Sequence, residues 1–338
     1  MAIIGNTYLG LIDVMKQNGN ELGDVVEALH TLNPVMKDAN VVTCNMGTKH
    51  RSSIRTGLPS VSWGALYEGI KQSKSATTQV DDVTGFVEGL STVDTRLLKI
   101  AGANAAKVRM SESTAFLEAM SQEFEKTFWY SNIGASPRKF HGFFARYNAL
   151  SNPNVVSGGG VGSDNTSIAM ITWGDQATSI ITPEGISAGI DREDKGEHRV
   201  TDAAGDPYYA KDELFTQHAG VTVKDWRYSG RVANIDVSDV IAGTRTINPL
   251  LRKLYYRLQG RRTYGMQNSG GIIGATRTVI YMNRTLLEAL DAESTNGAST
   301  NNFIQLRPKE IQGEEVLTWR GIPIRDTDNI LNSETVVA

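Results

Sequence analysis

The sequence has a single cysteine, Cys44, among its 338 residues, so no disulfide can form within the chain. One thiol in so long a chain is typical of proteins that fold in a reducing compartment. Cys44 lies between Val42 and Met46, which favours a buried, unreactive thiol over a nucleophile. The five histidines are never paired at the spacing of metal ligands. The sequence therefore predicts no metal site and no cofactor.

Long apolar runs and a strong net charge are also missing. No apolar run approaches eighteen residues, and the opening MAIIGNTYLG lacks the basic start and long apolar core of a signal peptide. We therefore expect no membrane partner. With 34 Lys and Arg against 37 Asp and Glu, the formal charge is −3. That balance argues against a protein whose main task is to grip nucleic acid, while leaving room for a surface that faces it.

The strongest helical pattern covers residues 111–131, SESTAFLEAMSQEFEKTFWYS. Its large apolar residues recur every four positions, as one side of a helix requires: Phe116, Met120, Phe124 and Phe128. Ser111 is the expected N-cap, and Gly134 and Pro137 end the helix. We predict a spine helix of roughly 30 Å whose apolar stripe forms core rather than a site.

Residues 47–95 read as two extended arms rich in Thr, Ser and Val, joined by the polar tip ALYEGIKQSKS at 65–75. A two-stranded hairpin alone is marginally stable, and this one has few large apolar residues to bury. We therefore expect it to gain stability from a neighbouring subunit. Residues 1–46 form an arm with one short helix at about 22–32, which must dock on another surface because so short a helix is marginal in water.

After the spine helix the pattern predicts several further elements. We expect a hairpin of two strands at 168–174 and 177–182, a solvated charged loop at 189–198, and one or two strands at 219–237 with a bulge at Lys224-Asp225. A helix begins at Asn248, with Pro249 suited to its first turn. A strand at 277–282 precedes a third helix, and further strands surround Gly321 near the end of the chain.

Three patterns are candidates for chemistry. Gly185 to Gly189 matches the G-x-S-x-G elbow of serine hydrolases, but Pro183 before Ser187 and the charged loop after it do not supply the strand and helix that the elbow needs. The glycine-rich stretch 157–163 lacks the G-K-[ST] ending of a phosphate loop, so we expect a flexible surface loop. We predict no catalytic residue, and we expect that the protein is not an enzyme.

The third candidate is the helix at 249–262. Its basic residues alternate with tyrosines and could contact phosphates and stack on bases: Arg252, Lys253, Arg257, Arg261 and Arg262, with Tyr255, Tyr256 and Tyr264. The net negative charge favours the alternative, a charged outer face that makes salt bridges across a subunit contact. A hydrolase built on Ser187 and a DNA-binding protein built on 249–262 remain the two rival classes.

Four longer motifs resemble the major capsid proteins of short-tailed bacteriophages, which have the Hong Kong 97-like capsid fold. They are RTGLPSVSW at 55–63, SKSATTQVDD at 73–82, SDNTSIAMITWG at 163–174 and VTVKDWRYSGRVANID at 221–236. The resemblance implies an α+β fold with an N-terminal arm (1–46), an E-loop (47–95), a P domain (96–246) that contains the spine helix 111–131, and an A domain (247–338). Trp319, Gly321 and Pro323 come almost at the end of the chain, which implies a permuted strand order.

The same resemblance implies a structural major capsid protein that self-assembles into hexamers and pentamers and then into an icosahedral shell, with T=7 favoured, around double-stranded DNA that it does not read by sequence. Its partners would be copies of itself, a separate scaffolding protein, a portal and possible decoration proteins. It would be assembled in the host cytoplasm and reside in the virion. A cellular nanocompartment shell of the same fold is the alternative. Covalent crosslinking by Lys71 or Lys74 is not implied, because the partner residues cannot be matched.

Overall fold

The computed structural model describes residues 33–202, 204–258, 277–295, 306–311 and 314–338. These residues group into two units, which are described separately. Unit 1 comprises residues 86–125 and 187–218, and unit 2 comprises 33–85, 126–186 and 219–338. The short helix predicted at 22–32 lies outside the described residues.

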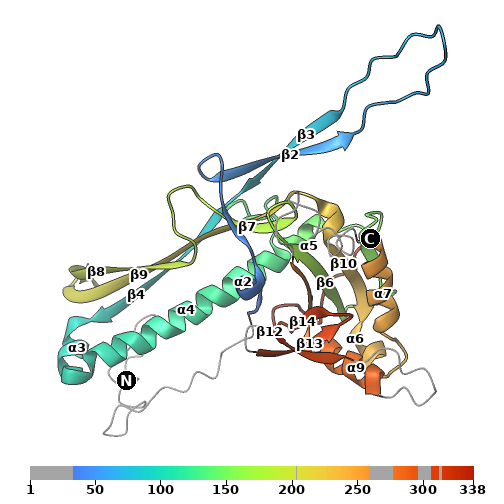
Figure 1. Cartoon of the computed structure of the whole chain (residues 1–338). Helices are drawn as coiled ribbons and strands as arrows, with labels where there is room; N and C mark the ends of the chain where they lie inside the picture. Colours follow the sequence, from blue (N-terminus) through green and yellow to red (C-terminus); the bar gives the residue numbers. More distant parts are fainter. Residues whose placement is uncertain (1–32, 203, 259–276, 296–305, 312–313) are drawn as a thin grey trace. The chain divides into compact units, whose positions relative to one another are not determined.

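Unit 1 combines one long helix with three strands. In chain order it contains β4 (Gly85–Asp94), α3 (Thr95–Ala101), the short 3-10 helix η1 (Gly102–Asn104), most of α4 (Ala105–Tyr130), β8 (Ile190–Thr201) and the first part of β9 (Pro207–Val223) (Figure 1). Strand β9 lies between β8 and β4. Asp94 caps α3 because its carboxylate accepts a hydrogen bond from the Arg96 amide at 2.7 Å.

Helix α4 is the predicted spine, but it begins at Ala105 rather than at Ser111. The expected N-cap at Ser111 is therefore wrong, because residues 105–110 are already helical; the Ser113 hydroxyl donates to the carbonyl of Arg109 one turn back. Within unit 1 the Phe116 ring stacks on Phe215 of β9 at 5.8 Å. The helix thus covers one face of the strands.

Strand β8 replaces the solvated loop predicted at 189–198. It pairs antiparallel with β9 from Ile190 opposite Gln217 to Thr201 opposite Pro207. The side chains of β8 are solvated as expected, since nearly all of them are exposed. Because neither face of β8 is buried, its sequence carries no apolar alternation from which a strand could be recognised.

Unit 2 contains a large mixed sheet and short helices. The elements not yet described are α2 (Val35–Asp38), β1 (Val41–Thr43), β2 (Lys49–Gly57), β3 (Ala76–Val83), α5 (Phe143–Arg146), β5 (Val155–Ser157), β6 (Asn165–Trp173), β7 (Thr178–Thr182), η2 (Trp226–Tyr228), β10 (Gly230–Asp236), α6 (Val237–Ile241), α7 (Asn248–Arg257), β11 (Arg277–Met282), α9 (Arg284–Thr295), β12 (Arg307–Ile311), β13 (Glu314–Trp319) and β14 (Ile322–Asp326). In this unit the strands follow the order β12-β13-β14-β11-β6-β7, with β10 also bonded to β6.

Strand β6 is central, and all nine of its residues are buried. It pairs antiparallel with β10 on one side and with β11 on the other. The hairpin predicted at 168–182 is therefore wrong: β7 meets β6 only at Trp173 and Thr178, in parallel, and pairs instead with β1 and β9. The predicted bulge at Lys224-Asp225 is also wrong, because β9 ends at Val223 and η2 separates it from β10.

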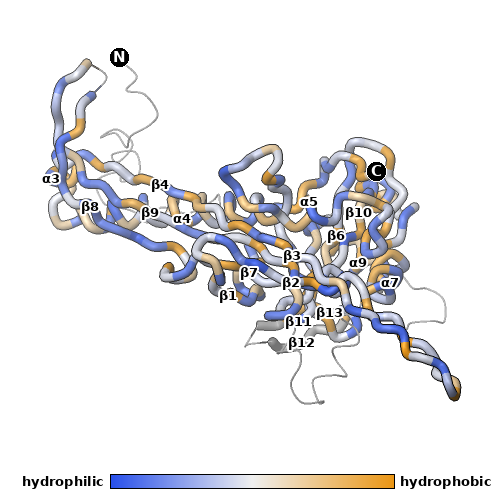
Figure 2. The backbone as a smooth tube through the Cα atoms, turned by 90° about the horizontal axis from the view of Figure 1, so that it is seen from above, coloured by the Kyte–Doolittle hydropathy of each residue, from blue (hydrophilic) through white to orange (hydrophobic). Residues whose placement is uncertain are grey.

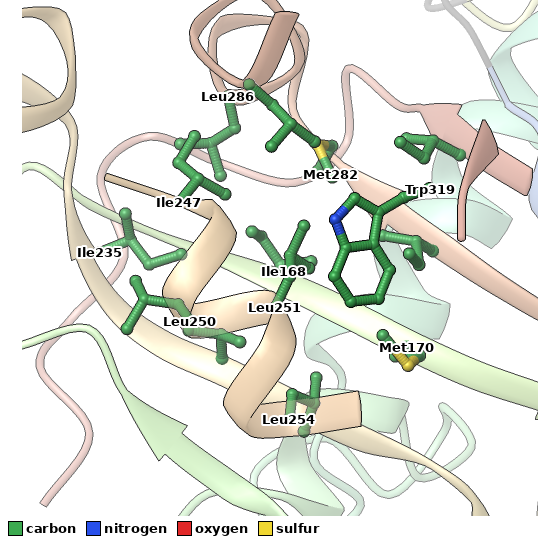
Figure 3. Close-up of a cluster of buried hydrophobic side chains, with 14 of the residues drawn as sticks. Ile168, Met170, Ile235, Ile247, Leu250, Leu251, Leu254, Met282, Leu286 and Trp319 are labelled. Atoms are coloured by element: carbon green, nitrogen blue, oxygen red, sulfur yellow. The ribbon is translucent and has the colours of Figure 1, made fainter. Parts of the chain in front are cut away.

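The largest apolar cluster of unit 2 joins this sheet to α6, α7 and α9. Figure 3 shows Leu251 and Leu254 of α7 close to Ile168 of β6, with the Trp319 indole beside them. The boundary predicted between residues 246 and 247 falls inside this cluster, so the strands before it and the helices after it share one core. Helix α7 begins at Asn248 with Pro249 in its first turn, and strand β11 covers 277–282, which confirms both predictions.

The glycine-rich stretch is tightly packed rather than a flexible loop. The amides of Gly158 and Gly160 donate to the carbonyls of Ala233 and Asn234, each at 2.7 Å. A Cβ atom on Gly158 would lie 2.6 Å from the Asn234 carbonyl oxygen, closer than real Cβ contacts allow. The glycines are therefore needed for a close backbone approach, not for mobility.

A buried ion pair fixes the C-terminal tail to unit 2. Arg231 of β10 donates to Glu334 at 2.7 Å, and both residues are more than nine-tenths buried. The other oxygen of Glu334 accepts a hydrogen bond from the Tyr130 hydroxyl at 2.6 Å. Burial and the neighbouring carboxylate of Glu334 raise the pKa of Tyr130, so its hydroxyl remains a donor. Ser167 of β6 also donates to Glu334.

A second buried pair fixes the base of the β2–β3 hairpin. Asp82 is 5% exposed and accepts a hydrogen bond from Arg146 at 2.7 Å, while Arg146 also donates to the carbonyl of Val221. His50 lies opposite Asp82 in the strand register and is buried as well. Burial lowers the pKa of His50, as does Lys224, while Asp82 partly offsets this. Burial also lowers the pKa of His141, again with Asp82 acting in the opposite direction.

None of the helices in the described part of the chain has both the length and the apolar character that crossing a bilayer requires.

Replacing Glu334 by Gln should lower the free energy of unfolding by about 3–5 kcal/mol, because it leaves Arg231 buried without a counter-charge. The measurement is urea unfolding followed by circular dichroism. Arg284→Gln is the control, since its pair with Asp328 at 3.0 Å lies at the surface. Its loss should lower the free energy of unfolding by about 1 kcal/mol or less. Equal losses in the two variants would contradict the role given to the buried pair.

The hairpin base should also make stability depend on pH. The folded pKa of His50 lies below its ordinary value of 6.5, so below that pH the unfolded chain takes up a proton that the folded chain does not. Stability is therefore present in full above pH 6.5 and is lost as the pH falls. Thermal melting between pH 7.5 and about pH 5 should show a shallower loss in His50→Gln than in the parent. Identical slopes in the parent and in His50→Gln would refute the assignment.

Candidate assembly surfaces

The predicted hairpin is present as an isolated two-stranded sheet. Strands β2 and β3 pair antiparallel from Lys49 opposite Val83 to Gly57 opposite Ala76. Residues 58–75 join them as a long open loop without regular strands or helices (Figure 1). The second arm is shorter than the prediction, because residues 85–94 form the separate strand β4.

The loop at 58–75, named here the hairpin tip, presents apolar side chains to solvent. Six of its large apolar residues are at least 82% exposed: Leu58, Val61, Trp63, Leu66, Tyr67 and Ile70. In Figure 2 the tip accordingly shows orange stretches between hydrophilic ones. Apolar area in water is unfavourable by about 25 cal/mol per Å², and contiguous exposed patches of this kind mark interaction sites. The tip therefore has the composition of a surface that becomes covered.

The ion pairs of the hairpin fix its two strands to each other and to the core. Arg51 and Asp81 face each other across the two strands and form an ion pair on the exposed side at 2.6 Å. The hydrogen bond from Arg51 lowers the pKa of Asp81. With Asp82 bonded to Arg146 at the base, the two strands are fixed in register while the tip has no such attachment to the core.

Unit 1 contains a buried carboxylate that links α4 to the two-stranded ribbon of β8 and β9. Glu213 is 3% exposed and accepts hydrogen bonds from Arg192 at 2.9 Å and from Ser113 at 2.7 Å; Arg109 also pairs with it. Burial would raise the pKa of Glu213, but these donors outweigh it and the net shift is downward. The charges of the cluster are balanced, with two arginines against two carboxylates, because Arg109 also pairs with Asp194.

The residues considered for chemistry are not brought together. Ser187 lies in an exposed loop, and strand β8 follows it instead of the helix that a nucleophile elbow requires. Cys44 is buried, and burial raises the pKa of its thiol, as expected for an unreactive cysteine. Among the residues that the structure describes, no three His, Cys, Asp or Glu side chains form a group that could hold a metal ion.

The basic helix is only partly described. Arg252 and Lys253 of α7 are exposed, while Arg257 donates to the carbonyl of Val155 at 2.9 Å. Arg320 lies over the rings of Tyr255 and Tyr256 at 5.6 and 5.7 Å. Arg261, Arg262 and Tyr264 lie outside the described residues. Of the described cations of the helix, Arg257 is therefore bonded to unit 2, while Arg252 and Lys253 face solvent.

The functional signal that sequence reasoning missed is the apolar character of the tip before Glu68. Leu58, Val61, Trp63 and Leu66 are spaced irregularly between glycine, proline and serine, so they match neither a helix nor a strand period. The available indication of an exposed contact surface was the presence of large apolar residues in a segment that cannot form regular structure.

Comparisons with known proteins give the family. The model of the family described as Major capsid protein GP7 matches residues 16–338. Among solved structures, a chain of bacteriophage Epsilon15 is 29% identical, with both chains covered in full and a TM-score of 0.73. The holo-SrpI encapsulin complex from Synechococcus elongatus is 10% identical, with 68% of this chain and 97% of that chain covered and a TM-score of 0.42. No curated protein sequence matches the chain.

These findings bear out the α+β fold of the Hong Kong 97-like type and the structural role that the sequence motifs implied. The full-length match to a phage protein agrees with a place in the virion. The chain belongs to the Major capsid protein GP7 family, and it is a structural subunit whose copies assemble into the shell of a bacteriophage capsid.

Proposed function

We propose that copies of this chain form hexamers and pentamers that close into an icosahedral shell around double-stranded DNA. The exposed apolar tip is the observation that supports this most directly. A ring forms when one patch of a subunit binds a different patch of the next copy and the rotation closes. A tip whose large apolar side chains are exposed is such a patch, so we infer that it lies over a neighbouring copy.

We further propose the division into an N-terminal arm (1–46), an E-loop (47–95), a P domain (96–246) and an A domain (247–338), with a permuted strand order. Because Ile168 and Val232 share one core cluster with Leu251, the P and A domains of this division would share a core rather than fold as separate bodies. The described end of the arm already docks on unit 2. Asp38 of α2 forms ion pairs with Arg277 at 2.8 Å and Arg325 at 3.2 Å, and β1 pairs with β7. T=7 geometry, a separate scaffolding protein, a portal and a decoration protein belong to the same proposal.

Permanent shell contacts of this type commonly bury on the order of 2,000–5,000 Å². Spread over several patches, each contact can be weak while the closed shell is stable. A change of about 1.4 kcal/mol in one contact weakens it tenfold, and the change recurs at every copy. Assembly should therefore be far more sensitive to the tip than folding is.

Replacing residues 58–75 by an Asn-Gly turn should keep β2 and β3 paired and change monomer stability by only about half a kcal/mol. Shell formation should be lost. The comparison is thermal melting of the unassembled subunit against shell yield by sedimentation and negative-stain microscopy, with any scaffold protein present.

Trp63→Ser should reproduce most of the assembly defect, because this side chain is fully exposed in the subunit. Val161→Ser is the matched control, since Val161 is 87% exposed but lies in the glycine-rich stretch. Normal shell formation by the protein with the shortened hairpin would show that the tip does not contribute to assembly. A large drop in monomer melting temperature would place the tip in its own core.

A further inference from the structure

Strand β4 has an open outward side in unit 1. Its residues alternate between the two sides of the strand, and Phe86 and Leu90 on the outward side are 62% and 53% exposed. Gly89 faces α4, because a Cβ atom there would lie 2.9 Å from the Phe116 ring. The helix therefore covers one side of β4 and leaves Phe86 and Leu90 in solvent.

The outward side also carries a charge at its centre. Glu88 lies between Phe86 and Leu90 on the same side of the strand and is exposed. At about 3.3 Å per residue, the two apolar groups are roughly 13 Å apart with the carboxylate midway. The His218 ring of β9 lies 5.5 Å from the Phe86 ring and extends the apolar strip. The strip is thus apolar at both ends and acidic in the middle.

The hairpin tip is net positive, because it carries two lysines, Lys71 and Lys74, against one carboxylate, Glu68. Lys71 and Lys74 are exposed and follow directly on the apolar series that ends at Ile70. The tip therefore offers apolar anchors next to cations, where the β4 strip offers apolar anchors around an anion. Complementary charge of this kind fixes the register of a contact and disfavours wrong partners.

We propose that the outward strip of β4, formed by Phe86, Glu88 and Leu90, receives the hairpin tip of a second copy of this chain, with Lys71 and Lys74 facing Glu88. The inference rests on the proposed function, since a shell subunit covers its exposed apolar groups with further copies of itself. It adds the acceptor surface and the residues that select it. The two patches belong to different units, and each is exposed in its own unit.

The test is a charge exchange. Glu88→Lys alone, and Lys71→Glu with Lys74→Glu, should each lower shell yield by roughly tenfold or more, because like charges then face each other in every contact. The triple variant should recover most of the yield. Glu184→Lys, at an exposed glutamate in the loop after β7, is the matched control and should assemble like the parent. Circular dichroism and melting of each subunit check that the variants fold.

A second readout identifies the occupant independently of shell closure. Leu90→Cys in one population and Ile70→Cys in another, mixed under mild oxidation, should give a disulfide-linked dimer only in the mixture, because the native Cys44 is buried. Val161→Cys replaces Ile70→Cys in the control mixture and should give none.

Normal assembly of Glu88→Lys, or a triple variant that stays defective with no disulfide dimer, would overturn the proposal. Crosslinking of Leu90→Cys to a scaffold protein instead would assign the strip to that partner and also refute it. If the parent forms no shells but the disulfide dimer appears, the icosahedral assembly fails while the contact between tip and strip stands.

Discussion

The buried pair of Arg231 and Glu334 is the interaction on which the rest of unit 2 depends. Two charges removed from water are tolerated only when they meet each other and their remaining hydrogen-bonding atoms find partners. Here those partners are Ser167 on β6 and Tyr130 at the end of α4, and the Arg231 guanidinium also lies 4.2 Å from the Phe144 ring. The pair therefore ties the C-terminal tail, two strands and the end of the spine helix into one arrangement.

Within that arrangement the buried charges meet counter-charges, and the surfaces that we propose for contacts between copies expose apolar side chains. The tip and the outward side of β4 follow this division, since neither contributes to the large core cluster of unit 2. A shell subunit needs both properties. Its core must be stable before assembly, and its contacts must be weak enough individually to be corrected while the shell closes.

Several elements were predictable because their pattern is local. Helix α7 has Pro249 in its first turn and a leucine side, and the β13–β14 turn places Arg320 and Gly321 at φ values of +51° and +81°, as a tight hairpin turn requires. The failures have two causes. Strand β8 pairs with the next strand, β9, but its exposed faces leave no apolar alternation from which a strand could be recognised. The partners of β6 lie far along the chain, and residue patterns within one segment do not specify which edge another strand will occupy.

The sequence by itself determined the spine helix, the β2–β3 hairpin and the family, because apolar period, strand composition and long motifs are properties of short segments. Only the tertiary structure decided which apolar residues are free for contact. Trp63 and Trp319 are both tryptophans in strand-like or turn-rich surroundings, yet one is fully exposed and the other fully buried. Burial depends on what packs over a side chain from elsewhere in the chain, and that information is absent from the residue and its neighbours.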